Sequence, residues 1–318
     1  MKAVFQYLKP IVFLSLAGFL LWVALRGINF SAFKNALQTI PLYWVALSML
    51  LGYLAFVFRG LRWKLLIHPM GYEAKNMDLV NSIAFGYLFN SFIPRSGELV
   101  RCTALNKVTN IPVSKLFGHV LLERLIDFIL LAICIILSII LNYNDFIQFS
   151  QLLAFPIDVV YYIIIGVFLI WILYRFRGHI LNTTQLNKID SFFQGIKAGF
   201  VSIKNMPHKL MFFIYTLLIW LCYLFMTVVC FYCFSQTKDL TLGQGLFIMV
   251  AGGLGMVVPT PTGIGSYHYL VIQALMVINI DRDIAQFFAL IVHSSQAIMI
   301  IMSGLLAMLF LYYKQAKN

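Results

Sequence analysis

Long apolar runs recur along the chain, and each ends at charged or polar residues. Six of them are long enough for a helix that crosses a membrane, which needs about 20 apolar residues. They cover Pro10–Leu25, Leu42–Phe58, Gly118–Leu141, Val159–Tyr174, Leu210–Phe234 and Ala285–Tyr313. The alternating pattern of barrel strands is missing from the sequence. The pattern therefore predicts an all-α polytopic membrane protein with six spanning helices.

Two further apolar stretches are interrupted. Leu79–Ile93 is short, carries several polar residues and ends at Pro94. Gly245–Ile278 is longer, and helix breakers cut through its middle. These breakers are Gly252, Gly253, Gly255, Pro259, Pro261, Gly263 and Gly265. Lipid cannot satisfy the backbone groups that a broken helix exposes. We therefore expect two re-entrant elements, each of which enters the membrane and returns to the same side.

The basic residues predict the orientation, because Lys and Arg prefer cytoplasmic loops. With a cytoplasmic N-terminus and two re-entrant elements, most of the 23 basic residues lie on the cytoplasmic side, including Arg59 and Arg62. The alternative of eight full spans would move the loop Asn142–Ile157, which has no Lys or Arg, into the cytoplasm. We therefore expect both termini in the cytoplasm and one re-entrant element entering from each side. Such an arrangement is typical of inverted-repeat transporters.

The segment Leu186–Lys204 has apolar residues at helical spacing with lysines between them. This pattern predicts an amphipathic helix that lies at the membrane interface.

Composition supports a membrane protein. Hydrophobic residues make up 62% of the 318 residues and charged residues 11%, against about 45–50% and about 25% in soluble proteins. Soluble enzymes, nucleic-acid-binding modules and disordered proteins are therefore excluded, and the net charge of +12 fits cytoplasmic loops better than nucleic acid. The five cysteines show no metal-ligand spacing, and no nucleotide or dinucleotide fingerprint occurs. We expect no metal, no cofactor and no enzymatic centre.

The first candidate site follows Pro94, where Arg95, Glu98 and Arg101 place one acid between two arginines. Arginine binds phosphate oxygens through two parallel hydrogen bonds, and Glu98 could pair with either arginine. The alternative is a cytoplasmic loop with a surface ion pair. We favour phosphate binding, because a polar, helix-broken hairpin beside basic residues costs free energy that a binding function would justify.

The second candidate site opens the apolar run Gly118–Leu141. Glu123 and Asp127 are four residues apart and should share one helix face, while Arg124 could pair with Asp127. Charges inside a membrane are costly and often functional. The alternative is a helix start whose positive dipole end is stabilised by the two acids. The two interpretations are compatible with each other.

The third candidate site is the breakpoint of the second interrupted stretch. We expect its backbone N–H groups, hydroxyls and helix N-terminus to converge on an anion. Its residues are Pro259, Thr260, Pro261, Thr262, Gly263, Gly265 and His268. The alternative is a kink that only allows close helix packing. His268 and His293 are each weak evidence when taken alone.

The three motifs, in this order and spacing, resemble the transmembrane "flippase-like" family, which includes the membrane part of lysylphosphatidylglycerol synthase, the multiple peptide resistance factor. The resemblance covers nearly the whole chain. It implies a multi-pass protein of the bacterial inner membrane, and in the synthase the corresponding region translocates aminoacylated phosphatidylglycerol. We expect residues 1–318 to form one such domain, without the aminoacyl-transfer domain. Thr262 and His268 depart from the usual form of the glycine motif.

These inferences favour translocation of a lipid with an anionic phosphate headgroup between leaflets. The substrate could be a phospholipid, an aminoacyl-phospholipid or a polyprenyl-linked lipid. A separate lipid-modifying synthase or glycosyltransferase is an expected partner, and nucleic acid is not. Two other functions stay open. One is an intramembrane transferase that acts on a lipid-linked donor, and the other is a non-catalytic scaffold for a lipid-modifying enzyme.

Overall fold

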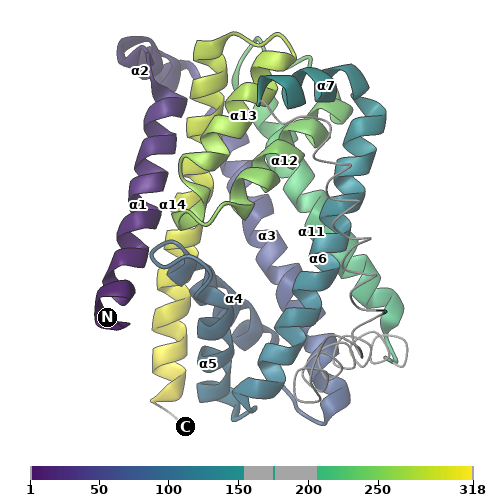
Figure 1. Ribbon diagram of the computed structural model, residues 1–318. Helices are drawn as coiled ribbons and strands as arrows, with labels where there is room; N and C mark the ends of the chain where they lie inside the picture. The colour runs from purple at the N-terminus through teal and green to yellow at the C-terminus, as the bar shows by residue number, and fades with distance from the viewer. Residues whose placement is uncertain (1, 154–174, 176–205, 317–318) are drawn as a thin grey trace.

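The structure is a computed structural model that describes residues 2–153, 175 and 206–316. In these parts of the chain all regular structure is helical, as predicted (Figure 1). The predicted span Val159–Tyr174 and the predicted interfacial helix Leu186–Lys204 lie outside the described residues.

Four described helices are long and apolar enough to cross a membrane. They are α3 (Leu42–Ile67), α6 (Val113–Leu141), α11 (Lys209–Val228) and α14 (Arg282–Gln315). A fifth span is counted only if α1 (Lys2–Leu25) and α2 (Phe30–Thr39) are taken together, although they bend by 82° at their junction. The described residues thus confirm a helical membrane protein with four or five spans, and not the full set of six.

Each interrupted stretch contributes to a helical hairpin. The first consists of α4 (Asn76–Asn90) and α5 (Gly97–Thr109), so the predicted element Leu79–Ile93 covers only its first arm. The second consists of α12 (Leu242–Val257) and α13 (Ser266–Val277), which are joined through the short helix η3 (Pro261–Gly263). The arms of each hairpin pack against one another. In Figure 1 the two hairpins lie in opposite halves of the molecule, with their tips towards its middle.

The glycines of α12 do not break the helix, contrary to the sequence prediction. Gly252, Gly253 and Gly255 continue α12, and the chain leaves the helix only after Val257. Gly255 has a packing role, because a Cβ there would lie 2.7 Å from the Cα of Tyr267 on α13. Small residues of this kind let membrane helices approach closely. The prolines and the glycines of the loop at 258–265 make the actual break.

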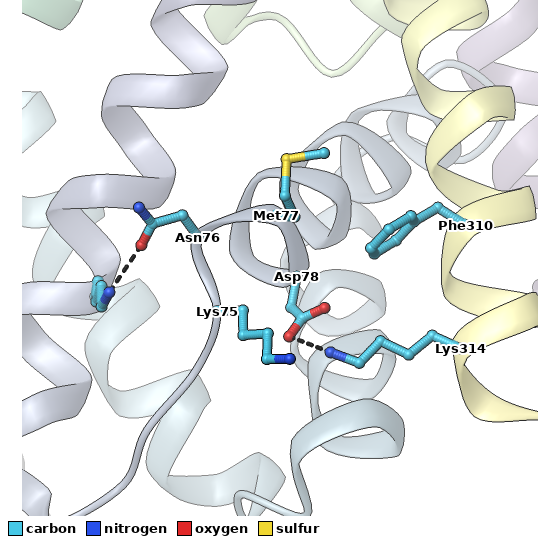
Figure 2. A pocket seen from close by; sticks show the side chains of 7 residues that line it. Lys75, Asn76, Met77, Asp78, Phe310 and Lys314 are labelled. Atoms are coloured by element: carbon cyan, nitrogen blue, oxygen red, sulfur yellow. Dashed lines mark hydrogen bonds and ion pairs between the residues drawn. The ribbon is translucent and has the colours of Figure 1, made fainter. Parts of the chain in front are cut away.

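The remaining elements complete the ends of the molecule. The short helices η1 (His68–Met70) and η2 (Val229–Cys233) extend α3 and α11, and α7 (Tyr143–Leu152) follows α6. Helix α14 packs along α4, and one ion pair fixes them near the C-terminus, where Lys314 Nζ lies 2.5 Å from Asp78 Oδ2 (Figure 2). This contact holds the base of the first hairpin in place.

Candidate functional site

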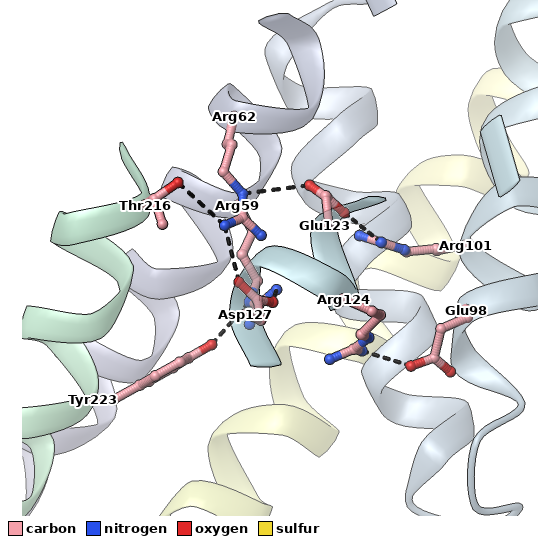
Figure 3. Close-up of polar contacts among 9 residues, drawn as sticks. All are labelled: Arg59, Arg62, Glu98, Arg101, Glu123, Arg124, Asp127, Thr216 and Tyr223. Atoms are coloured by element: carbon pink, nitrogen blue, oxygen red, sulfur yellow. Dashed lines mark hydrogen bonds and ion pairs between the residues drawn. The ribbon is translucent and has the colours of Figure 1, made fainter. Parts of the chain in front are cut away.

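Two buried acids on α6 form the centre of a charged cluster (Figure 3). Glu123 and Asp127 are one helical turn apart, and both lie inside the protein. Arg62 of α3 reaches between them, with its Nε 3.6 Å from Glu123 Oε1 and its Nη1 3.0 Å from Asp127 Oδ1. The prediction that these two acids share one face is confirmed.

Two more arginines complete the buried part of the cluster. Arg59 of α3 lies 2.9 Å from Asp127 Oδ2, and its Nε donates a hydrogen bond to the Tyr223 hydroxyl of α11 at 2.8 Å. Arg101 of α5 donates to Glu123 Oε2 at 2.5 Å, and its guanidinium lies 4.7 Å from the centre of the Trp63 ring. Helices α3, α5, α6 and α11 therefore meet at this cluster.

Arg59 and Arg62 lie on α3, although the sequence interpretation ended the second span at Phe58. Helix α3 continues to Ile67, and these two residues are 5% and 0% exposed. Their spacing of three residues puts both on one helix face, where the two acids of α6 offset their charge. The three-residue spacing of these arginines matches the four-residue spacing of Glu123 and Asp127. This match is the sequence feature that could have predicted the pairing.

A second, more open pair lies beside the buried cluster. Arg124 Nη2 is 2.6 Å from Glu98 Oε1, and the two side chains are 43% and 22% exposed. The sequence had allowed Glu98 to pair with Arg95 or Arg101, and Arg124 to pair with Asp127, but the described structure contains none of these pairs. Asp127 is already paired with Arg59 and Arg62, and Arg101 is paired with Glu123. Arg124 instead pairs with Glu98 on α5.

Arg95 lies at the tip of the first hairpin and contacts the second hairpin. Its Nη2 donates to the backbone carbonyl of Val257 at 3.4 Å, and its φ of 64° allows the sharp turn there. The sequence predicted that Arg95 and Arg101, on either side of Glu98, bind phosphate, and that stays a prediction. In the structure Arg95, Arg101 and Arg124 have three separate partners.

The hydroxyls of the second hairpin tip bond to the tip itself. The hydroxyls of Thr260 and Ser266 lie 3.1 Å apart, and Ser266 also donates to the carbonyls of Gly255 and Gly263. Thr262 donates to the carbonyl of Pro261. These hydroxyls hold the loop around Pro259, Pro261 and Gly263 together. Convergence of these groups on an anion therefore stays a prediction without support from the described contacts.

Two histidines that gave weak signals separately lie together at this tip. The ring centres of His268 and His293 are 4.6 Å apart. His268 Nδ1 accepts a hydrogen bond from the Gly265 N–H at 3.3 Å, and His293 Nε2 lies 2.9 Å from the carbonyl oxygen of Thr262. Both rings therefore tie the loop to helices, α13 in one case and α14 in the other.

The buried cluster has hydrogen-bonding capacity to spare. Arg62 Nε and Nη2, Arg101 Nε and Glu123 Oε1 have no hydrogen-bond partner among the described residues. Buried polar groups normally have partners, because leaving them without one costs about 1–3 kcal/mol each. The buried cluster thus retains donors and an acceptor that a further polar group could satisfy.

The chain is similar to known membrane proteins over most of its length. The family described as the lysylphosphatidylglycerol synthase TM region matches residues 10–304. The UPF0104 membrane protein of Methanocaldococcus jannaschii is 25% identical over 304 residues, and the alignment covers 87% of each chain. No solved structure matches the chain.

Proposed function

Because the chain belongs to the family of the lysylphosphatidylglycerol synthase TM region, we propose that it translocates a lipid with an anionic phosphate headgroup between membrane leaflets. Phospholipids, aminoacyl-phospholipids and polyprenyl-linked lipids are the substrate class. The observation that carries the proposal is the Arg124–Glu98 pair. It is a partly exposed ion pair that borders a buried group of arginines in a protein of apolar helices.

The buried cluster and the partly exposed pair beside it together fit this function. The buried pairs of Arg59, Arg62 and Arg101 fix the positions of the charges. Arg124 is open enough to exchange Glu98 for a phosphate. A headgroup that leaves water needs such fixed donors, because an unpaired charge inside a membrane is too costly. The cluster holds one more arginine than carboxylates, which favours an anion.

The order of elements supports an inverted repeat. The helix α3, the hairpin α4–α5 and the helix α6 are followed later by the helix α11, the hairpin α12–α13 and the helix α14. The two sets run in opposite directions in Figure 1. In transporters with inverted repeats, the two halves move against one another around a central site. The contact of Arg95 with Val257 lies where the hairpin tips meet.

The basic residues and the family support the remaining features of the proposal. The chain lies in the inner membrane with both termini in the cytoplasm, and it acts as a transporter, not as an enzyme. A lipid-modifying synthase or a glycosyltransferase supplies its substrate.

The test is lipid scrambling in proteoliposomes with a fluorescent anionic phospholipid. Arg124→Lys keeps the charge but loses the planar fork, and we expect a rate about ten- to a hundred-fold lower, the value of one charged hydrogen bond. Arg282→Lys is the matched control, because the hydrogen bond that Arg282 makes among the described residues is exposed and far from the cluster, to the carbonyl of Arg26. A wild-type rate for Arg124→Lys would overturn the proposal and favour a scaffold.

A further inference from the structure

A basic pocket lies at the end of the molecule where α14 ends, away from the arginine cluster. It has a volume of about 540 Å³ and lies between α3, α4 and α14 (Figure 2). Lys64, Lys75 and Lys314 line it, one from the end of α3, one from the start of α4 and one from the end of α14. Two consecutive helices and the distant helix α14 thus each bring one ammonium group to the same pocket.

The charges of the pocket do not cancel. Its one acid, Asp78, is 1% exposed and pairs with Lys314. Lys64 donates to the side-chain oxygen of Asn76 at 2.8 Å, which is a neutral partner. Within the described parts of the chain, Lys75 makes no ion pair. The pocket therefore carries two positive charges in excess, and the positive dipole end of α4 adds to them.

The rim of the pocket is apolar. Met77 and Phe310 line it and are 57% and 37% exposed. Two exposed tyrosines, Tyr312 and Tyr313, follow on the same end of α14. Aromatic residues of this kind are enriched at the level of lipid headgroups. A basic pocket with an apolar rim matches a molecule that has both a phosphate and acyl chains, whereas free phosphate needs only the basic groups.

We propose that this pocket binds the headgroup phosphate of an anionic phospholipid from the bilayer, with the acyl chains along Met77 and Phe310. The phosphate bridges Lys64 and Lys75, while Lys314 remains with Asp78. The bound lipid thereby joins α3, α4 and α14 at the base of the first hairpin. This is a structural lipid site, distinct from the route through the arginine cluster.

The experiment uses the full purified chain in micelles of a neutral detergent. Dioleoyl-phosphatidylglycerol, dioleoyl-phosphatidylcholine and inorganic phosphate are titrated separately. Native mass spectrometry counts retained lipids, and the thermal unfolding midpoint reports stabilisation. We expect the anionic lipid to be retained and to raise the midpoint. We expect phosphatidylcholine and inorganic phosphate at equal concentration to do neither.

Two variants make the test specific. Lys75→Gln changes an exposed side chain, so the fold should survive, and we expect retention of the anionic lipid to weaken roughly five-fold, the value of one lysine at a charged surface. Lys107→Gln removes the same charge from α5 outside the pocket and should leave retention unchanged.

Three results would overturn the inference. Retention by Lys75→Gln equal to that of the wild type would show that the pocket is not the site. An equal loss in Lys107→Gln would show general attraction to a basic surface. Stabilisation by inorganic phosphate equal to that by the anionic lipid would show a free-anion site. The assay measures no scrambling, so its outcome is independent of the proposed transport.

Discussion

Arg95 donates a hydrogen bond to the backbone carbonyl of Val257, and this contact joins the tips of two hairpins that belong to different halves of the chain. The bond is 3.4 Å long and exposed, so it is weak by the usual geometric criteria. The tips can therefore separate at little cost. If the halves move during transport, this contact breaks and reforms in each cycle.

A cross-link between the tips should stop transport. We expect the variant Arg95→Cys/Val257→Cys, joined by a cleavable thiol cross-linker, to lose scrambling down to the protein-free background, because the two halves can no longer separate. Cleavage should restore the rate. The measurement is scrambling in proteoliposomes before and after cleavage. The single-cysteine variants, treated in the same way, show any effect of the five native free cysteines. Full activity in a cross-linked sample would rule out movement of the tips.

Neutralising Glu123 should lower the stability of the protein more than neutralising Glu98. Glu123 is buried beside Arg101 and Arg62, whereas Glu98 and its partner Arg124 are partly exposed. We expect Glu123→Gln to lower the free energy of unfolding by about 3–5 kcal/mol, because it leaves buried arginines short of a counter-charge. Glu98→Gln should cost at most about 1 kcal/mol. Thermal unfolding in detergent compares the two variants. Equal unfolding midpoints would contradict the conclusion that Glu123 is a buried counter-charge.

Two neighbouring glycines of α12 should respond in opposite ways to an added methyl group. A Cβ at Gly255 would lie 2.7 Å from the Cα of Tyr267, whereas at Gly253 the nearest atom is 3.5 Å away on Leu131. We expect Gly255→Ala to destabilise the protein by about 1–3 kcal/mol through overpacking. Gly253→Ala should be neutral or stabilise it by up to about 1 kcal/mol. The free energy of unfolding checks both, and the second variant is the matched control for the first.

The orientation in the membrane can be tested at two positions. Lys107 lies on α5 and Asn144 on α7, and Figure 1 places these helices at opposite ends. Lys107→Cys should react with an impermeant thiol reagent from the cytoplasmic side only, and Asn144→Cys from the outside only, because basic residues favour the cytoplasm. Labelling of intact cells and of inverted vesicles gives the answer. Reaction of both positions from the same side would contradict the hairpin arrangement.

The hairpins were predictable because their breaks are local properties of the chain. Pro94 and the loop at 258–265 interrupt apolar runs, and lipid tolerates such breaks only inside protein. The role of Gly255 was not predictable, since a glycine in an apolar helix can either break it or let a neighbour approach. Only the position of Tyr267 on the second arm decides between these outcomes.

The ion pairs were harder to predict than the helices. The sequence shows that Glu123 and Asp127 share a face, but it does not show which helix lies opposite. Arg59 and Arg62 resemble the basic residues that usually end a span, so the charge rule assigned them to the cytoplasm. Their burial depends on contacts between α3 and α6 over 60 positions apart, which local pattern does not encode.

The imbalance of one arginine in the cluster has an electrical consequence. An empty cluster with four arginines and three carboxylates holds about one elementary positive charge within the helices. The membrane potential acts on such a charge with about 2.3 kcal/mol per 100 mV if it moves across the whole membrane. A singly charged anionic headgroup would cancel it. We therefore expect the membrane potential to bias the conformational change of the protein without bound lipid. It should have little effect on the same change with an anionic lipid bound.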